Sequence, residues 1–382
     1  MTVVTFLGPG GHGWASAREI VFSKDPKRQD ENLKREINFL QAPADHGGAS
    51  GLMSRLLELD QGVLNRSLHG DIAFPIYPWG DYNKLIAFFI GQRHPDCEAS
   101  FLARSSNLNQ LVGYFDSFAS CIKADRALVQ NFMEYIHEIF EYSSNSGFPL
   151  SDVSVAHFFN PFIFNREGTM EKFNQYYHDI GILPKNCFLH FLTQSRVVLH
   201  GEDCNGTILV GEDIIDDHNL PIAPKDYSLR KVNGELITGE DIKDSLDLIT
   251  RSDYILLPNG SIANVFPIIN ILEVQELLVP LGQDDRVIML QNLFYKQNEL
   301  PNNVYVSYLI KTLGIEPTVI GPMIEVYTAN EALLKRYEVQ GKKASPMPIG
   351  KIAYHARLDL EVKDGLKYTP DSMFRALNRL LR

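Results

Sequence analysis

The chain has 382 residues, of which 45% are hydrophobic, and its net charge is −11. This length and apolar content suffice for a substantial core in one large or two smaller domains. The 47 Asp and Glu outnumber the 36 Lys and Arg, which argues against a nucleic-acid partner but leaves room for a small anionic ligand. No apolar run is long enough to span a bilayer and no signal-like segment opens the chain, so we expect no membrane partner and a cytoplasmic location.

The first predicted unit is a buried strand over residues 3–7, followed by a glycine-rich loop and then a helix over residues 14–22. The loop reads Gly8-Pro9-Gly10-Gly11-His12-Gly13 and matches neither G-x-G-x-x-G nor G-x-x-x-x-G-K-[ST]. A tight strand-to-helix turn therefore stays open as an alternative to a phosphate contact. The mixed charges of residues 24–36 predict a solvated linker.

A second unit of the same kind follows, with a strand over residues 37–40, the turn Asp45-His46-Gly47-Gly48-Ala49-Ser50-Gly51 and a helix from Leu52. Glycines let the backbone approach a ligand, and a helix N-terminus offers unpaired N–H groups to an anion. Asp45 stands at the end of the strand, where its carboxylate can bind a metal, a hydroxyl or a base. An Asx-turn or a helix N-cap is the alternative for Asp45.

Helices are predicted over residues 81–90, 107–118, 126–142 and 170–180, so residues 81–180 form a mainly helical insertion. Strands over residues 188–199 and 206–210, with a hairpin turn at 203–206, indicate a β excursion over residues 188–238. The sequence contains four cysteines without C-x-x-C spacing: Cys97, Cys121, Cys187 and Cys204. We therefore expect free thiols rather than a disulfide framework or a zinc site.

Strands and helices then alternate again. Helices are predicted over residues 241–249, 268–278, 303–313, 330–337 and 370–381, and strands over 254–257, 286–290 and 351–362. This alternation predicts an α/β fold, with a Rossmann-like parallel sheet covered by helices on both faces. Ligands of such sheets bind beyond the carboxyl ends of the strands, where the glycine loops fall.

Four landmarks carry a resemblance to a known family. They are Gly10-Gly11-His12-Gly13, the turn from Asp45 to Gly51, Gly70-Asp71-Ile72, and Tyr254-Ile255-Leu256-Leu257-Pro258-Asn259-Gly260-Ser261 with Pro267 beyond. In order and spacing they resemble the 2-phospho-L-lactate transferase (CofD-like) family and its UDP-N-acetylglucosamine-binding gluconeogenesis-factor (YvcK-like) branch. The resemblance implies a single large domain over residues 1–382.

The resemblance also implies a site. Asp45 and Asp71 would be catalytic, and Asp45 would hold Mg²⁺. Ligand contacts would come from Gly10, Gly11, His12, Gly13, His46, Gly47, Gly48, Ser50, Asn160, Gly260, Ser261 and Asn292. The chain departs from the family pattern at His12, His46, Ala73 and Phe74, which removes a carboxylate and an arginine that suit Mg²⁺ and phosphate.

Two functions follow from this resemblance. In the first, the chain binds a nucleotide diphosphate-linked ligand and transfers its phosphoryl-linked group to an acceptor hydroxyl. In the second, it is a non-catalytic regulatory protein that binds a nucleotide sugar. Both functions are compatible with a homodimer. The motifs of zinc metalloproteases, α/β-hydrolases and P-loop NTPases are missing, and bulky Trp14 directly after Gly13 disfavours an NAD-binding half.

Overall fold

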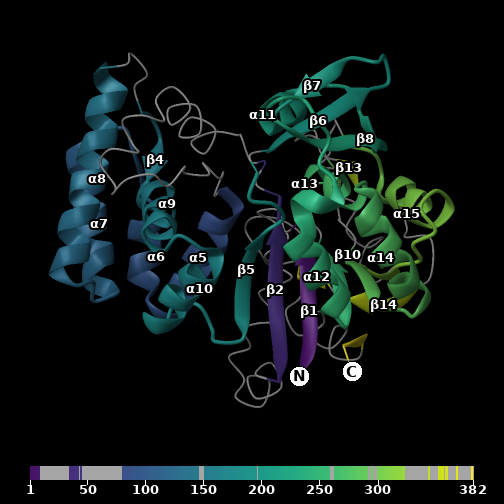
Figure 1. The fold of residues 1–382 in the computed structure, drawn as a ribbon, viewed down its shortest axis with the longest axis horizontal. Coiled ribbons are helices and arrows are strands. Elements are labelled where there is room, and N and C mark those ends of the chain that lie inside the picture. The colour runs from purple at the N-terminus through teal and green to yellow at the C-terminus, as the bar shows by residue number, and fades with distance from the viewer. Residues whose placement is uncertain are drawn as a thin grey trace. The chain divides into compact units, whose positions relative to one another are not determined.

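The computed structural model describes residues 1–8, 34–42, 44, 80–145, 150–195, 197–258, 262–290, 294–295, 299–322, 343–344, 352–356, 358–359, 367–368 and 380–381 (Figure 1). The chain divides into two compact units. The first comprises Met1–Ala42 and Asn186–Arg382 and is here named the sheet unit. The second, Pro43–Lys185, is named the helical unit.

A seven-stranded sheet with the order β14-β12-β10-β9-β1-β2-β5 forms the centre of the sheet unit. Its strands are β1 (Thr2–Leu7), β2 (Arg35–Gln41), β5 (Cys187–Phe191), β9 (Tyr254–Leu257), β10 (Val287–Leu290), β12 (Thr318–Pro322) and β14 (Ile352–Ala356). Every neighbouring pair is parallel. Numbered along the chain, the order is 7-6-5-4-1-2-3, which contains the doubly wound 3-2-1-4-5-6 arrangement. The predicted Rossmann-like α/β class is confirmed.

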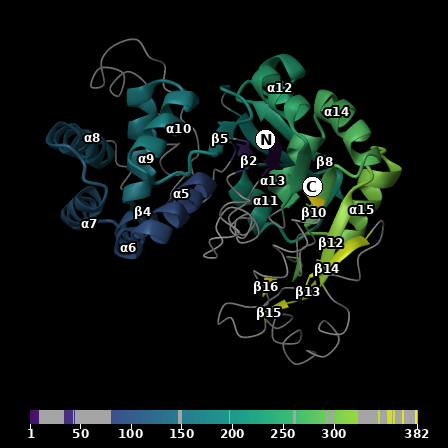
Figure 2. The ribbon, with the colours of Figure 1, turned by 90° about the horizontal axis from the view of Figure 1, so that it is seen from below.

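Apolar runs account for the central position of these strands. The last four residues of β1, the last five of β2 and all of β10 are buried, as expected for strands covered on both faces. The helices α12 (Lys243–Arg251), α13 (Ile262–Ile269), α14 (Leu272–Gln283) and α15 (Asn302–Lys311) flank the sheet (Figure 2). The predicted helix over residues 330–337 lies outside the described residues, as do the helix over residues 14–22 and most of the one over 370–381.

A smaller antiparallel sheet is formed by β6 (Val197–Asp203), β7 (Ile208–Val210) and β8 (Ile222–Lys231), with α11 (Glu212–Asp217) beside it. The predicted hairpin turn after Asp203 is confirmed, because the Asp203 carboxylate accepts the N–H groups of Asn205 and Thr207. The predicted strand over residues 188–199 is instead two strands. β5 extends the edge of the parallel sheet, and β6 starts the antiparallel one.

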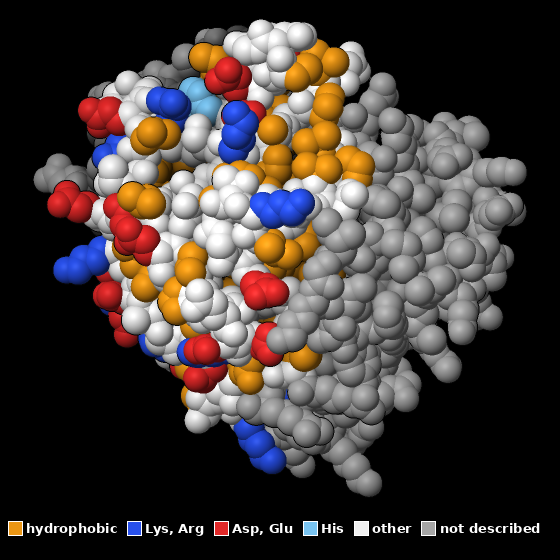
Figure 3. Space-filling view, turned by 90° about the vertical axis from the view of Figure 1, so that its right-hand side faces the viewer, with side chains coloured by type: hydrophobic (Ala, Val, Ile, Leu, Met, Phe, Trp, Pro, Cys, Tyr) orange, Lys and Arg blue, Asp and Glu red, His pale blue; other side chains and the backbone are white. Residues whose placement is uncertain are grey.

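Short elements complete the sheet unit. They are the 3₁₀ helix η1 (Gly239–Ile242) and the two-stranded pairs of β11 (Phe294–Tyr295) with β13 (Lys343–Ala344) and of β15 (Leu358–Asp359) with β16 (Lys367–Tyr368). On the face shown in Figure 3, Lys and Arg side chains are interspersed with Asp and Glu, with hydrophobic atoms between them. The described part of that face therefore has a mixed field rather than a field of one sign.

The helical unit contains six helices among its described residues. They are α5 (Gly80–Arg93), α6 (Pro95–Leu102), α7 (Leu108–Cys121), α8 (Arg126–Asn145), α9 (Val155–Glu167) and α10 (Met170–Asp179), with β3 (Arg104–Ser105) pairing with β4 (Val153–Ser154). Side-chain oxygens cap several of these helices. Asn107 accepts two backbone N–H groups at the start of α7, Asp125 accepts that of Leu128 at the start of α8, and Thr169 accepts that of Lys172 at the start of α10. These caps fix where the helices begin.

Phenylalanine rings fill the core of the helical unit around Phe159 of α9. Its ring centroid lies 5.0 Å from that of Phe118, 5.3 Å from that of Phe132 and 6.2 Å from that of Phe115. Phe159 and these neighbours are fully buried. The rings of Phe118 and Phe132 meet that of Phe159 edge to face, and this packing joins α7, α8 and α9.

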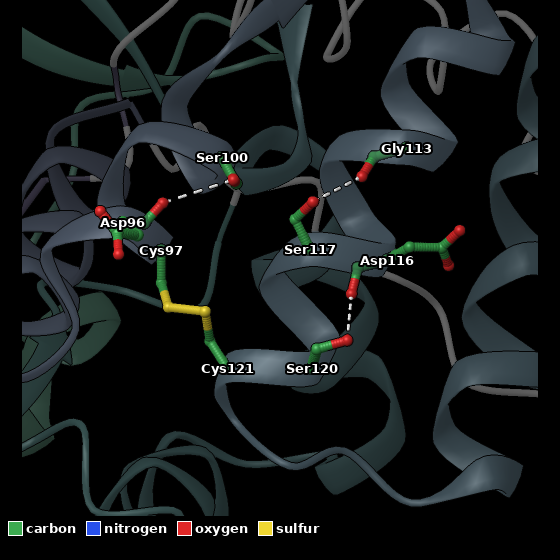
Figure 4. Close-up of a disulfide and its surroundings, with 8 residues drawn as sticks. All are labelled: Asp96, Cys97, Ser100, Gly113, Asp116, Ser117, Ser120 and Cys121. Carbon is green, nitrogen blue, oxygen red and sulfur yellow. Dashed lines mark hydrogen bonds between the residues drawn. A yellow bond between two sulfur atoms is a disulfide. The ribbon is translucent and has the colours of Figure 1, made fainter.

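The expectation that all four cysteines are free thiols is wrong for two of them. Cys97 of α6 and Cys121 of α7 form a disulfide, with 6.2 Å between their Cα atoms (Figure 4). Their separation of 24 residues gave no signal in the sequence, because only the packing of α6 on α7 brings them together. Cys187 and Cys204 form no disulfide.

No single helix among the described residues has both the length and the apolar content to cross a bilayer. The bent pair Ala263–Ile269 and Leu272–Gln283, with 94° between its helices, meets that test only when the two are taken together.

Candidate functional site

The sheet reverses its strand order between β1 and β9. The chain passes from β1 to β2 on one side and later returns to β9 on the other side, with Phe6 paired to both Phe39 and Leu256. In open parallel sheets such a reversal leaves a crevice beyond the carboxyl ends of the two central strands, because their loops diverge. This switch point is the candidate site.

Gly8 shapes the exit from β1 at the switch point. Its φ of +61° lies in the left-handed region, and its N–H donates to the carbonyl oxygen of Leu40 at 2.9 Å. A Cβ atom placed on Gly8 would lie 2.1 Å from the carbonyl oxygen of Asn264, in the first turn of α13. Glycine is therefore required twice, for backbone conformation and for close approach of the loop to the helix. Sequence reasoning did not single out Gly8, although it begins the predicted loop.

Four neighbouring strands end at the edge where the predicted ligand residues begin. β10, β9, β1 and β2 are consecutive and parallel, so the loops after Leu290, Leu257, Leu7 and Gln41 leave from the same edge of the sheet. The expectation that these strands end at one edge of a parallel sheet is confirmed. Most candidate residues themselves lie outside the described residues: Gly10, Gly11, His12, Gly13, Asp45, His46, Gly47, Gly48, Ser50, Asp71, Gly260, Ser261 and Asn292. Their roles remain predictions.

Asn160 is the one candidate that the structure describes, and it belongs to the helical unit. Its side chain is fully buried; its Nδ2 donates to Asn83 Oδ1 at 2.5 Å, and its Oδ1 accepts from the Tyr177 hydroxyl. Burial raises the pKa of Tyr177, which keeps that hydroxyl protonated as a donor. Asn83 Nδ2 is buried and has no hydrogen-bond partner within the described part of the chain. Asn160 lies within α9 rather than in a turn, and both ends of its carboxamide are bonded inside the helical unit.

A series of polar side chains in the sheet unit is linked by an ion pair and hydrogen bonds. Arg251 pairs with Glu36 at 2.6 Å, Glu36 accepts from Asn38 at 3.0 Å, and Asn38 Oδ1 lies 2.9 Å from His190 Nε2. Burial, with a contribution from the Arg251 charge, lowers the pKa of His190 to about 4. Neutral His190 therefore joins the edge strand β5 to β2 and carries no charge at neutral pH.

A cavity of about 340 Å³ lies at the opposite edge of the sheet, lined by Met1, Thr2, Asp253, Tyr254 and Arg286. The Arg286 guanidinium donates to the carbonyl oxygens of Ser252 at 2.7 Å and Asp253 at 2.6 Å. Its donors therefore hold the strand ends together. The cavity adjoins amino ends of strands, where parallel α/β sheets do not bind their ligands.

No cluster of three or more His, Cys, Asp or Glu suited to a metal ion occurs among the described residues. The predicted Mg²⁺ ligand Asp45 and its companion Asp71 lie outside that part of the chain. The Mg²⁺ site therefore stays a prediction from the sequence.

Two solved structures are similar to the chain over almost its full length. One is a member of the UPF0052 family from Bacillus halodurans, with 16% sequence identity, a TM-score of 0.63, and coverage of 98% of this chain and 99% of that one. The other, a structure of protein BH3568 from Bacillus halodurans, has 17% identity, a TM-score of 0.65 and 99% coverage of both chains. No protein-family model and no curated protein matches the chain. At these identities the likeness concerns the fold, and we conclude that the chain has the α/β fold of a UPF0052 family protein.

Proposed function

We propose that the chain binds a nucleotide diphosphate-linked ligand in the crevice between the carboxyl ends of β1 and β9. The observation that carries this proposal is the reversal of strand order at β1 and β9, with Gly8 held in a left-handed conformation against α13. The sequence adds glycine loops after both strands. Backbone N–H groups of such loops bind a diphosphate even in an acidic protein, because the local field matters more than the net charge.

For the chemistry, we propose phosphoryl-linked group transfer of the kind that the resembled transferases perform. An acceptor hydroxyl would attack the phosphorus distal to the nucleoside, the phosphoanhydride bond would break, and the nucleoside monophosphate would leave. Asp45 or Asp71 would take the hydroxyl proton, and Asp45 would hold Mg²⁺. A bound Mg²⁺ would neutralise charge on the phosphoryl oxygens.

The second candidate is a non-catalytic protein that binds a nucleotide sugar as a regulatory ligand. The observation that favours it is the replacement of the second aspartate of the turn by His46, with Ala73 and Phe74 where the family has Arg and Asn. Both candidates use the same crevice. They differ in whether the ligand is consumed.

Calorimetry of the full chain against UDP-N-acetylglucosamine, GDP and GTP tests the shared proposal. We expect binding between low micromolar and millimolar, roughly −8 to −4 kcal/mol. Gly11→Val and Gly260→Val should abolish binding while far-UV circular dichroism stays unchanged. Gly113→Val is the control, because open space surrounds Gly113 on α7. Unchanged affinity in both loop variants, or no binding of any of the three compounds at millimolar concentration, would contradict the proposal.

Two further measurements separate the candidates. Mass spectrometry of the nucleotide compound after incubation shows whether it is converted or returned intact. If Asp45 acts through Mg²⁺, Asp45→Asn should weaken nucleotide binding far more in Mg²⁺ buffer than in EDTA, because only the metal-bridged contribution is lost. Equal losses in both buffers would assign Asp45 to shaping the turn.

A further inference from the structure

The disulfide between Cys97 and Cys121 joins the first turn of α6 to the last residue of α7. We propose that this pair is a redox-reversible clamp of the helical unit, closed as the disulfide and opened by a dithiol reductant. The clamp would make the stability of α6 and α7 depend on redox conditions and would leave the sheet unit unaffected.

Aromatic packing beside the clamp allows it to open without loss of the fold. Phe101 lies one turn after Cys97, and Phe118 lies one turn before Cys121, so each ring is on the same face as its cysteine. The two ring centroids are 4.8 Å apart, and both side chains are fully buried. This apolar contact holds α6 against α7 when the sulfur atoms part, so the reduced state differs from the oxidised state in stability rather than in architecture.

The two cysteines differ in exposure, and this difference determines which sulfur atom the reductant attacks. Cys97 is only 2% exposed, whereas Cys121 is half-buried. A thiolate of the reductant therefore attacks Cys121 Sγ, the bond between the two cysteines breaks, and Cys97 leaves as a thiolate that takes a proton from water. The second thiol of the reductant then attacks the mixed disulfide and releases Cys121. Two electrons pass from the dithiol, which becomes a disulfide.

Figure 4 shows the polar side chains around the clamp bonded back to their own helices. The hydroxyl of Ser117 donates to the carbonyl oxygen of Gly113 at 3.0 Å, and that of Ser120 donates to the backbone carbonyl oxygen of Asp116 at 2.8 Å. Both bonds are exposed to solvent. None of the hydrogen bonds given for these residues crosses between the two helices, and those of Ser117 and Ser120, close to Cys121 in the sequence, are in contact with solvent.

The other two cysteines do not share this arrangement. Cys187 is fully buried in β5, where burial raises the pKa of its thiol, and Cys204 is exposed in the hairpin turn between β6 and β7. Both belong to the sheet unit. They provide internal standards, because neither forms a disulfide in the structure.

Thiol counting on the full chain, purified without reductant, is the first test. Labelling with iodoacetamide in denaturant should modify Cys187 and Cys204 alone, and labelling after dithiothreitol should modify all four cysteines. Treatment of the reduced native protein with oxidised glutathione should return the count to two. Labelling of all four without reductant, or failure to re-form the bond from the native reduced protein, would overturn the proposal.

Hydrogen exchange then measures the consequence. Dithiothreitol should accelerate amide exchange in α6 and α7 by up to roughly 400-fold, the effect of releasing a loop closed across 24 residues, and should leave the exchange of β1 and β9 unchanged. The double variant Cys97→Ser/Cys121→Ser should not respond to the reductant. Cys204→Ser, the control, should respond as the wild type does. Exchange that is unaffected by reduction would refute the clamp.

Single variants test the direction of attack. In Cys97→Ser, native Cys121 should react with iodoacetamide at least about 10-fold faster than native Cys97 does in Cys121→Ser, because the latter thiol is buried. In urea the two rates should become equal. Equal rates in the native proteins would contradict the order of steps given above.

Discussion

Replacing Gly8 by alanine tests the packing that defines the candidate site. Two penalties combine at this position. An L-residue at a φ of +61° costs about 1–2 kcal/mol. The new Cβ would also lie 2.1 Å from the Asn264 carbonyl oxygen, so the loop or α13 must shift. This shift costs about 1–3 kcal/mol more. We expect Gly8→Ala to lower the free energy of unfolding by about 2–5 kcal/mol.

Gly314→Ala is the matched control for this variant. Gly314 has a φ of +70° and no atom within 4 Å of the position of an added Cβ, so it isolates the backbone penalty of about 1–2 kcal/mol. Urea denaturation followed by far-UV circular dichroism measures both variants, and the difference between them gives the contact with α13. If the two substitutions cost the same, Gly8 does not lie tightly against Asn264, and the crevice loses its structural basis.

Three other substitutions follow from buried contacts. Tyr177→Phe should lower the free energy of unfolding, measured in urea, by about 1–3 kcal/mol, because the buried Asn160 oxygen loses its donor. Tyr114→Phe, at a half-buried site, is the control and should leave that free energy unchanged. An unfolding free energy of Tyr177→Phe equal to that of the wild type would mean that the bond contributes nothing. Phe159→Ala should cost about 3–5 kcal/mol in thermal melts, and a loss below about 1 kcal/mol would contradict the ring packing. The pKa of His190 is about 4 in the folded protein and about 6.5 in the unfolded chain. The contribution of neutral His190 to the free energy of unfolding is therefore fully present above about pH 6.5 and is lost as the pH falls toward 4. His190→Gln should flatten urea midpoints measured between pH 7 and 5, and an unchanged pH dependence would refute this assignment.

The sequence predicted the elements whose signals are local. Apolar runs located β1, β2, β9 and β10, and the Asp-Cys-Asn-Gly segment located the hairpin turn after Asp203. These predictions succeed because a buried strand and a tight turn are each specified by a few adjacent residues. The prediction over residues 188–199 joined two strands. In both β5 and β6, buried residues alternate with more exposed ones, so only their partner strands distinguish them.

For the candidate site, the sequence supplied the glycine loops and the carboxylates, together with the expectation that they gather at one edge. It could not supply the burial of Asn160 between Asn83 and Tyr177, because those partners are 77 and 17 residues away along the chain. The sequence did not indicate the pairing of Cys97 with Cys121 for the same reason, because 24 residues separate the two cysteines.

The α/β class was therefore determined by the sequence, through the alternation of apolar strands with amphipathic helices. Tertiary structure alone decided that β9 lies beside β1, which creates the switch point, and that Gly8 touches the first turn of α13. These contacts join residues about 250 positions apart, as the bond between Thr5 and Ser252 across 247 positions illustrates. Local propensity cannot encode such pairs, because their free energy exists only once the intervening chain has folded and brought both partners into one core.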